Sequence, residues 1–590
     1  MTILDVNQFR EQLLITPNEI SFLTLISQTY LNHSSEDSKI SEEIIKIHNQ
    51  GLRDVVECFS KLKNESTSEV NFFLVRQIFE QVLPNLKAPV VQVMQCVLHL
   101  VKVAGQDMTA GSVYIPFTEF CTADSFRPKE CLSLIESSKN EYNSFLVPTL
   151  IAGSRIDHVF YFNETLRLLE HDDVEVRRIA TFALGRLVYP KNSNSLQESY
   201  QRLGKIIGEQ EDEITLANAI NTLIELYKID KTHEALVARL IDITLSKGSD
   251  LTLHEASRLF GLHGDEIPDS IDSIFLGYLW QTKAGSQSFL QNIDYGLNKL
   301  IKKGKEVEVV GFLEKLISRN KGKINFHVFN QTGLFILNNQ RLLGHLVTKW
   351  FLTGDKGLCE AIESLVRLAH NNFLPLSIDP TELDSTNPDG YLFVARKAIG
   401  YLFLEPVTVS CILISLIQHS EDDTTIQKIS ELLYDPLLIN YPRQVSDYLE
   451  QQIDAQETKV HDAIESAIKN FEQYLEHMKS AGEIPELHPS QENREVYGRK
   501  LQREVSEAMK NAEKQSTFLS IIPKSILLYG RKSIDYSYDI EGQARRIEIP
   551  LKSFESEMKL PRLETIDPFG LDYMIRIFKA EQMIKHETYN

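Results

Sequence analysis

The amino-acid sequence predicts an all-α fold of consecutive helix pairs, and three observations lead to this class. Only 27 glycines and 20 prolines occur among the 590 residues, which is less than an average soluble protein contains. Apolar residues recur at helical spacing through most of the chain, with short polar breaks between the periodic segments. Pairs of these segments repeat about every 35–45 residues, as expected of helical repeat arrays.

The composition narrows the class of protein further. Hydrophobic residues make up 42% of the chain, so a large buried core can form. The formal net charge of −20 argues against a protein that coats phosphate backbones over its whole length, although a local basic face can still bind nucleic acid. The six cysteines show no zinc-ligand spacing, which is typical of buried thiols in a reducing compartment.

Two further features concern the location of the protein. The N-terminus shows no signal-peptide pattern, and the most apolar run, residues 407–417, is too short to cross a bilayer. We therefore expect a cytoplasmic protein that does not insert into membranes. No motif indicates a cofactor or a metal ion, and we expect neither.

Residues 1–130 form the first predicted region, an N-terminal helical block. Residues 16–19 resemble a capping box with proline at the first helical position, which predicts that a helix begins there. The glycine, proline and aromatic residues of 105–127 predict a longer loop at the end of the block. Apolar periodicity predicts four helices before this loop, over residues 17–30, 41–62, 69–83 and 89–103.

Residues 131–455 form the second predicted region, an array of helix pairs, and the clearest pair covers residues 162–190. Its second helix follows a polar break and carries apolar residues at i, i+3, i+4, i+7 and i+8. Asp173 can cap this helix, and Arg177, four residues later, lies within reach of the Asp173 carboxylate. The array continues in weaker pairs at 203–228, 236–260, 271–300, 307–337, 342–369, 391–418 and 425–453.

The segment 162–190 resembles a HEAT repeat. The resemblance rests on the leucines of the first helix, the turn at Asp173, the pair Val176-Arg177 and the small residues Ala180 and Gly185. His171 and Val174 depart from the usual pattern of the family. The resemblance implies a right-handed α-solenoid, in which Asp173 and Arg177 stabilise the turn, and it implies a scaffold or adaptor that binds protein partners.

Residues 456–515 form the third predicted region, a helical hairpin of coiled-coil type. The apolar residues of its first helix are spaced alternately by four and three residues, from Val460 to Met478, which is a heptad seam. The second helix, residues 494–515, repeats this spacing from Leu501 to Ala512. Because about a dozen residues join the two helices, we expect them to pack against each other within one chain.

Residues 516–590 form the fourth predicted region, a small C-terminal α/β module. Alternating and β-branched residues predict short strands at 525–530, 533–539 and 544–550, with turns at glycines between them. A final helix is predicted near residues 571–585. Tyr and Arg residues are typical of binding hot spots, so we consider four of them candidate partner-binding residues: Tyr536, Tyr538, Arg545 and Arg546.

The sequence contains no P-loop, no dinucleotide-binding glycine motif, no nucleophile elbow and no zinc-protease motif, which favours a protein without enzymatic activity. One pattern supports another hypothesis. Asp535 or Asp539, together with Glu557 and Lys559, resembles the Asp and Glu-x-Lys residues of some metal-dependent nucleases, in which carboxylates hold Mg²⁺.

Two locally basic segments, residues 299–323 and 494–514, are candidate nucleic-acid contacts. We therefore predict a non-enzymatic scaffold or adaptor that binds protein partners through its array surface and its C-terminal module. The alternative is a HEAT-like nucleic-acid-binding protein, with a nuclease-like effector module at its C-terminus. In that alternative the contacts would be Lys302, Lys303, Lys305, Arg499, Lys500 and Arg503.

Overall fold

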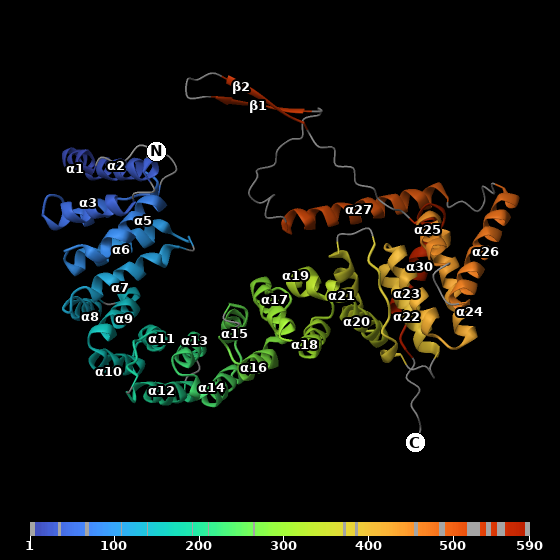
Figure 1. The fold of residues 1–590 in the computed structure, drawn as a ribbon, viewed down its shortest axis with the longest axis horizontal. Coiled ribbons are helices and arrows are strands. Elements are labelled where there is room, and N and C mark those ends of the chain that lie inside the picture. Colours follow the sequence, from blue (N-terminus) through green and yellow to red (C-terminus); the bar gives the residue numbers. More distant parts are fainter. Residues whose placement is uncertain are drawn as a thin grey trace. The chain divides into compact units, whose positions relative to one another are not determined.

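The computed structural model of the chain divides into two compact units, and each is described by itself. The first unit holds residues 1–282 and 286–299, and the second holds residues 283–285 and 300–590 (Figure 1). The structure describes residues 6–33, 37–64, 70–107, 109–138, 140–191, 193–209, 212–262, 266–369, 373–383, 388–453, 458–482, 490–515, 532–538, 544–550 and 561–583. For the two strands it describes the backbone alone.

The first unit consists of helices, which confirms the all-α prediction for this part of the chain. Its helices are α1 (Val6–Ile15), α2 (Glu19–Asn32), α3 (Asp37–Asn49), α4 (Val55–Phe59), α5 (Phe72–Val82), α6 (Val90–Ala104), α7 (Tyr114–Thr122), α8 (Arg127–Ser137), α9 (Leu146–Ile156), α10 (His158–Leu169), α11 (Val174–Leu184), α12 (Ser195–Glu209), α13 (Glu213–Ile229), α14 (Glu234–Ser246), α15 (Asp250–Leu262) and α16 (Asp269–Leu279). Helix α17 (Gln287–Lys302) crosses the boundary between the units.

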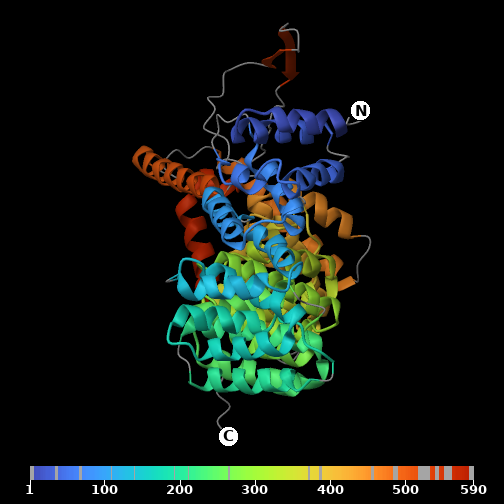
Figure 2. The same ribbon diagram turned by 90° about the vertical axis from the view of Figure 1, so that its left-hand side faces the viewer.

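Helices of the first unit pack against their neighbours in the chain and against the next helix but one. Helix α11 contacts α9, α10 and α13, and α13 contacts α14 and α15 (Figures 1 and 2). Ala180 and Ala183 on α11 are fully buried, as their small size predicts. After α11, a Cβ atom on Gly185 would lie only 3.0 Å from the Thr222 Cα atom, so glycine permits the close approach of α13.

The predicted loop over residues 105–127 is wrong, because it contains helix α7. This helix follows a short 3-10 turn and buries Phe117, Phe120 and Cys121 completely. Pro116 lies in its first turn, where proline does not interrupt helical hydrogen bonds. The aromatic residues that suggested a turn-rich loop are therefore the core side of a helix.

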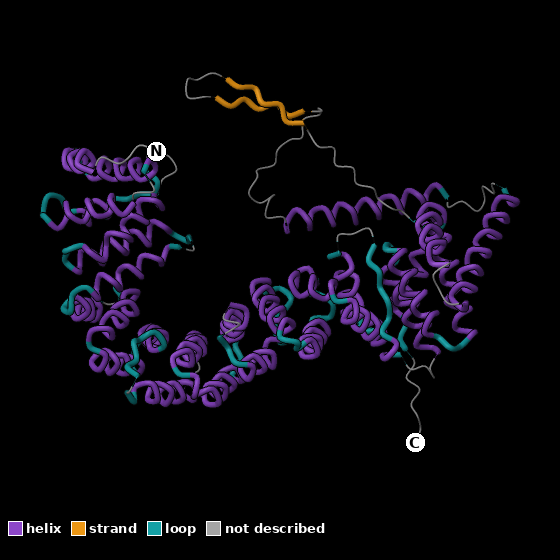
Figure 3. The backbone as a smooth tube through the Cα atoms, in the orientation of Figure 1, coloured by secondary structure: helices purple, strands orange, loops and turns teal. Residues whose placement is uncertain are grey.

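The second unit is also mainly helical (Figure 3). Its elements are α18 (Glu306–Arg319), α19 (Asn330–Asn338), α20 (Gln340–Thr353), α21 (Lys356–Arg367), α22 (Pro388–Leu402), α23 (Pro406–His419), α24 (Asp423–Leu432), a π-helix (Leu433–Leu438), α25 (Pro442–Ile453), α26 (Thr458–Ala481), α27 (Gln491–Gln515), β1 (Lys532–Tyr538), β2 (Ala544–Pro550), α29 (Arg562–Ile566) and α30 (Pro568–Ala580).

The most apolar run of the sequence lies in α23, which is buried in the second unit. Nine of its residues, from Val409 to Ile417, belong to the core. Helices α22, α24, α25 and α26 pack around it. Among the helices that the structure describes, none is long and apolar enough to span a membrane.

The predicted helical hairpin over residues 456–515 is wrong. Helix α26 buries Val460, Ile464 and Phe471, but it does so against α23, α24, α25 and the π-helix. On α27, Leu501 and Val505 are 36% and 47% exposed, so they do not cover that seam. A heptad seam shows that a helix has an apolar face but does not show which neighbour covers it.

At the C-terminus, β1 and β2 form an antiparallel pair in which Tyr536 is opposite Arg546 and Ser537 is opposite Arg545. The third predicted strand, residues 525–530, lies outside the described residues, as do Asp539, Glu557 and Lys559 of the nuclease-like pattern. The predicted final helix is present as α30, and it packs against α22.

Candidate partner-binding site

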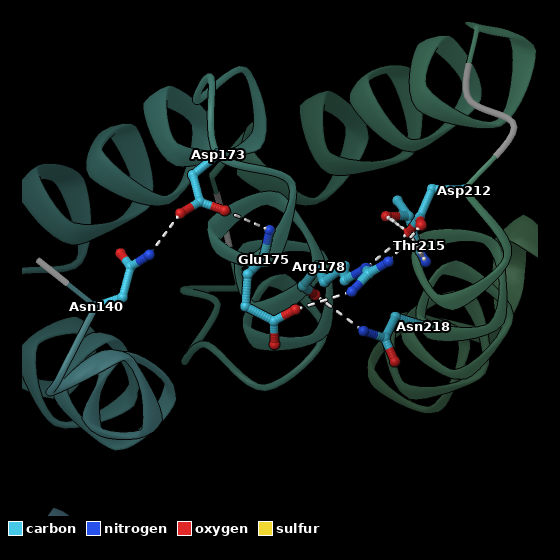
Figure 4. A network of polar contacts seen from close by, with 7 residues as sticks. All are labelled: Asn140, Asp173, Glu175, Arg178, Asp212, Thr215 and Asn218. Carbon is cyan, nitrogen blue, oxygen red and sulfur yellow. Dashed lines mark hydrogen bonds and ion pairs between the residues drawn. The ribbon is translucent and has the colours of Figure 1, made fainter.

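Asp173 and Arg177, the two residues predicted to stabilise the turn before α11, each stabilise it through a different set of hydrogen bonds. Asp173 accepts a hydrogen bond from the Glu175 backbone N–H at 2.8 Å, and its other oxygen accepts one from Asn140 Nδ2 at 2.9 Å (Figure 4). These two hydrogen bonds hold the pKa of the Asp173 carboxyl below its usual range. Arg177 donates to the carbonyl oxygens of His171 and Asp172, at 2.6 and 2.9 Å, and so closes the turn.

The next residue, Arg178, is not among the residues predicted from the sequence, and it links one helix pair to the following pair. Its guanidinium donates to both carboxylate oxygens of Asp212, at 3.0 and 2.6 Å (Figure 4). Asp212 caps α13 by accepting from the backbone N–H and the hydroxyl of Thr215. Asn218 on α13 donates to the Arg178 carbonyl oxygen at 2.9 Å. This network fixes α11 against α13, so it is structural.

The six basic candidate residues lie on α17, on the turn between α17 and α18, and on α27. Lys302 and Lys303 are exposed at the end of α17, and Lys305 precedes α18. On α27, Arg499, Lys500 and Arg503 are exposed. One cavity of the second unit is lined by Lys500 and by none of the three lysines around α17 and α18. Tyr536, Tyr538, Arg545 and Arg546 lie on the paired strands, whose side chains are outside the description.

That cavity lies where the C-terminal helix α30 packs against the rest of the second unit. The residues at the start of α30 explain where this helix begins. Asp567 caps the helix by accepting a hydrogen bond from the Gly570 N–H at 3.0 Å, and Pro568 occupies the first turn. Leu571 is buried on the face toward the protein. The preceding helix, α29, is attached by a hydrogen bond of 3.0 Å from the Leu563 N–H to Oδ1 of the buried Asn440.

Two adjacent basic residues of α22 hold the other end of α30. Arg396 pairs with both oxygens of the Glu581 carboxylate, at 2.8 and 2.6 Å. Lys397 is fully buried, and its Nζ donates to the carbonyl oxygen of Lys579 at 2.6 Å. A cation is favourable there because the last carbonyls of a helix carry negative partial charge. Burial lowers the pKa of the Lys397 ammonium group, and its carbonyl partner satisfies one of its donors.

A glycine on α22 allows α30 to lie close against it. A Cβ atom on Gly400 would be 3.1 Å from the Lys579 backbone nitrogen and 3.2 Å from Phe578 Cβ. A larger residue would push the helix away and would disturb the hydrogen bond to Lys397. Gly400 therefore allows α30 to pack at this position on α22.

The docked helix closes one side of a cavity of about 480 Å³. Its walls combine aromatic and aliphatic side chains with charged groups of both signs. The lining residues are Glu363, Arg367, Gly400, Tyr401, Leu402, Phe403, Leu404, Glu405, Tyr497, Lys500, Leu501, Pro561, Glu564, Leu571, Asp572, Ile575 and Lys579.

Some of the charged groups at this cavity lie close to groups that offset their charge. Asp572 lies 2.9 Å from Arg576 and 3.9 Å from Lys500. Lys579 Nζ lies 5.0 Å from the centre of the Tyr401 ring, within cation–π distance. Burial, together with the nearby Asp572 charge, raises the pKa of the Glu564 carboxyl. The cavity thus offers both hydrogen-bonding and apolar contacts.

The outer face of α30 carries three large apolar side chains that are about half exposed or more. Phe569, Tyr573 and Ile577 are 50%, 68% and 46% exposed, and their spacing of four places them on one stripe of the helix. We call these three residues the α30 stripe. The Tyr497 ring on α27 lies 6.2 Å from the Phe569 ring, so the stripe continues toward the exposed Leu501.

The sequence carried a signal for this stripe. Between residues 568 and 580 apolar residues occupy both sides of the helix, with Leu571, Ile575 and Phe578 on one and the stripe on the other. A helix that is apolar all round is typical of a buried position. The helix is among the elements predicted from the sequence, but the stripe is not among the predicted binding residues.

Comparison with known proteins assigns no family to the chain. No protein-family model matches it, and no curated protein matches it. Among solved structures, a crystal structure of an engineered protein is similar over 80% of this chain and 99% of its own, at 14% sequence identity. The TM-score of 0.20 is too low for this likeness to support an inference.

Proposed function

We propose that the protein is a non-enzymatic scaffold or adaptor, built as a HEAT-like α-solenoid, and that it binds a protein partner at the α30 stripe and the adjoining cavity. The observation that carries the proposal is the exposure of Phe569, Tyr573 and Ile577 on a helix that is firmly docked. Contiguous exposed apolar residues with a polar rim are typical of protein-binding surfaces.

The way in which α30 is held supports this interpretation. Arg396, Lys397 and Gly400 fix the inner face of the helix, so the stripe is presented in one orientation. A partner would therefore lose little free energy in ordering the surface it binds. Aromatic residues such as Tyr573 are also the residue types that contribute most at protein interfaces.

The packing of the first unit is in keeping with the HEAT-like part of the proposal. Helix pairs contact the next pair in the chain. The Arg178–Asp212 ion pair, for example, joins α11 to α13, which are the second helices of two consecutive pairs. In such arrays each pair is stabilised by its neighbours, which leaves long surfaces for binding.

Nucleic-acid binding is the second candidate function, and the exposed Arg499, Lys500 and Arg503 on α27 favour it. These residues form one basic segment, whereas Lys302, Lys303 and Lys305 belong to other elements. The cavity beside Lys500 also contains four carboxylates, which disfavour a phosphate backbone. We therefore rank this function below protein binding.

Affinity capture with surface variants tests the proposed function. We expect Tyr573→Asp to lose a protein that the wild-type chain retains, because a carboxylate in the stripe would have to be desolvated on binding. Val307→Asp is the matched control, since Val307 is 87% exposed on α18. Identical sets of captured proteins for the wild type and both variants would contradict the proposal.

A further inference from the structure

A second cavity, of about 620 Å³, lies in the first unit, among the ends of four helices. It is formed where α8 begins, where α9 ends and where α10 and α12 begin. Its lining residues are Ser125, Phe126, Lys129, Ile156, Asp157, His158, Val159, Tyr161, Pro190, Ser193 and Ser195. None of them belongs to the surface around α30, so any role of this cavity is independent of the function proposed above.

The rim of the cavity is apolar and exposed. Phe126 and Val159 are 75% and 68% exposed. Local hydrogen bonds hold the backbone at or next to them: Asp124 accepts from the Phe126 N–H at 2.9 Å, and Asp157 accepts from the N–H of Phe160, the residue after Val159, at 3.1 Å. The rim therefore offers a preformed contact for an apolar side chain.

A buried polar group without a partner lies at the same cavity. Tyr161 is 1% exposed, and in the described part of the chain its hydroxyl has no hydrogen-bond partner. The neighbouring His158 does have partners: its Nε2 lies 2.9 Å from Ser195 Oγ, and its ring is hydrogen-bonded to the backbone of Val188. Burial without a partner is unfavourable for the Tyr161 hydroxyl, so a ligand that supplies the missing hydrogen bond is favoured.

The chemistry of these groups distinguishes between classes of ligand. The cavity has one lysine, Lys129, and one carboxylate, Asp157, so it favours neither an anion nor a cation. The pair of His158 and Ser195 has the distance of a base and a nucleophile, but the imidazole makes its other hydrogen bond to the Val188 backbone rather than to an acidic third residue. The arrangement therefore favours binding over nucleophilic catalysis.

We propose that this cavity binds an uncharged peptide segment of a partner protein. A backbone amide of the peptide can satisfy the Tyr161 hydroxyl, while the adjacent apolar side chain lies between Phe126 and Val159. Peptide recognition commonly combines such main-chain hydrogen bonds with a side-chain pocket. This site makes the protein capable of holding two partners, one on each unit.

A phage-displayed library of random twelve-residue peptides, selected on the full-length chain, tests the proposal. We expect enriched peptides with an apolar residue and no net charge, and we measure their affinity by fluorescence anisotropy. Val159→Asp should weaken binding at least about tenfold, because the apolar contact is lost. Tyr573→Asp, at the α30 stripe, and Val307→Asp serve as matched controls and should leave this affinity unchanged.

The isosteric variant Tyr161→Phe separates a binding role from a structural role. If the hydroxyl serves the ligand, this variant binds the peptides about fivefold more weakly, while its melting temperature is equal to or higher than that of the wild type. A selection without enrichment, or peptides that bind Val159→Asp and Tyr161→Phe as tightly as the wild type, would overturn the proposal. Peptides that lose binding only with Tyr573→Asp would do so too, while supporting the function proposed for the α30 stripe.

Discussion

At the scale of single residues, Arg177 and Arg178 show which contacts the spacing of residues along a helix can predict. The sequence places both on the helix that Asp173 caps, and the resemblance to a HEAT repeat singles out Arg177. In the structure Arg177 closes its own turn, whereas Arg178 reaches Asp212 on the next pair. Sequence periodicity identifies residues that share a helix face, but the partner 34 residues away depends on how the helices pack.

The ion pair of Arg178 and Asp212 makes the stability of the first unit depend on pH. Arg178 holds the pKa of the Asp212 carboxyl far below its usual range, and hydrogen bonds from Thr215 act in the same direction. A carboxyl whose pKa is lower in the folded state stabilises the fold above its unfolded pKa of about 3.9 and loses that contribution as pH falls below it.

Arg178→Ala should therefore lower the free energy of unfolding by about 1–2 kcal/mol at pH 7. The difference from the wild type should shrink as pH falls from about 4, where Asp212 becomes protonated in the unfolded chain. Urea denaturation between pH 7 and pH 3 measures this difference. Arg202→Ala, which removes an exposed ion pair with Glu170, is the control and should change stability much less. A difference that is constant with pH would contradict the assignment.

A second prediction at the scale of single residues concerns Lys397, whose ammonium group is buried against the end of α30. Lys397→Ala removes the donor to the Lys579 carbonyl and leaves a space beneath the helix. We expect a loss of about 2–3 kcal/mol in the free energy of unfolding of the second unit, measured by urea denaturation. The same substitution at Lys356, which is 79% exposed, should change stability by less than about 0.5 kcal/mol. Equal effects at both positions would show that Lys397 does not hold α30.

At the scale of elements, the sequence predicted most helices but not which surfaces meet. The apolar seam from Val460 to Phe471 is real, and it is buried. It packs against α23, α24, α25 and the π-helix rather than against α27, because those preceding helices leave an apolar face that must be covered. In the same way, the predicted final helix exists as α30, yet its place on α22 depends on Arg396, Lys397 and Gly400, which are about 180 residues away in the sequence.

Phe471 tests the corrected packing of α26. This residue is 7% exposed, so Phe471→Glu places a carboxylate in an apolar contact and should cost several kcal/mol of stability. Leu475→Glu, one turn later at 39% exposure, is the matched control and should cost less than about 1 kcal/mol. Thermal denaturation compares the two variants, and light scattering checks the molecular mass. A change in mass on Phe471→Glu would show that the seam is an interface between chains.

At the scale of the whole molecule, two candidate binding sites lie on separate compact units. The α30 stripe belongs to the second unit, and the cavity of Phe126 and Val159 belongs to the first. Because no residue is shared between them, their binding energies should be independent. If both proposals hold, the protein joins two partners, as the proposed adaptor function requires.

The independence of the two sites can be measured directly. For a peptide selected on the first unit, the double variant Val159→Asp/Tyr573→Asp should bind as weakly as Val159→Asp alone, within about twofold. For a protein captured by the second unit, the double variant should resemble Tyr573→Asp alone. A double variant that differs from both expectations would show coupling between the units.

The charge of the whole molecule decides between protein binding and nucleic-acid binding. With a net charge of −20, the chain repels a polyanion except at local basic surfaces such as Arg499 and Arg503 on α27. A non-specific DNA duplex should therefore show no binding at physiological salt in a fluorescence anisotropy titration up to about 10 μM protein, since non-specific binders typically have dissociation constants of about 1–100 μM. If binding occurs at low salt, Arg499→Glu/Arg503→Glu should abolish it, and Arg341→Glu should not, because Arg341 is exposed on α20, outside both basic segments. Micromolar binding at physiological salt, with a steep dependence on salt concentration and loss in the α27 variant, would rank nucleic-acid binding above the scaffold function, because counterion release from several phosphate contacts is the signature of such a surface.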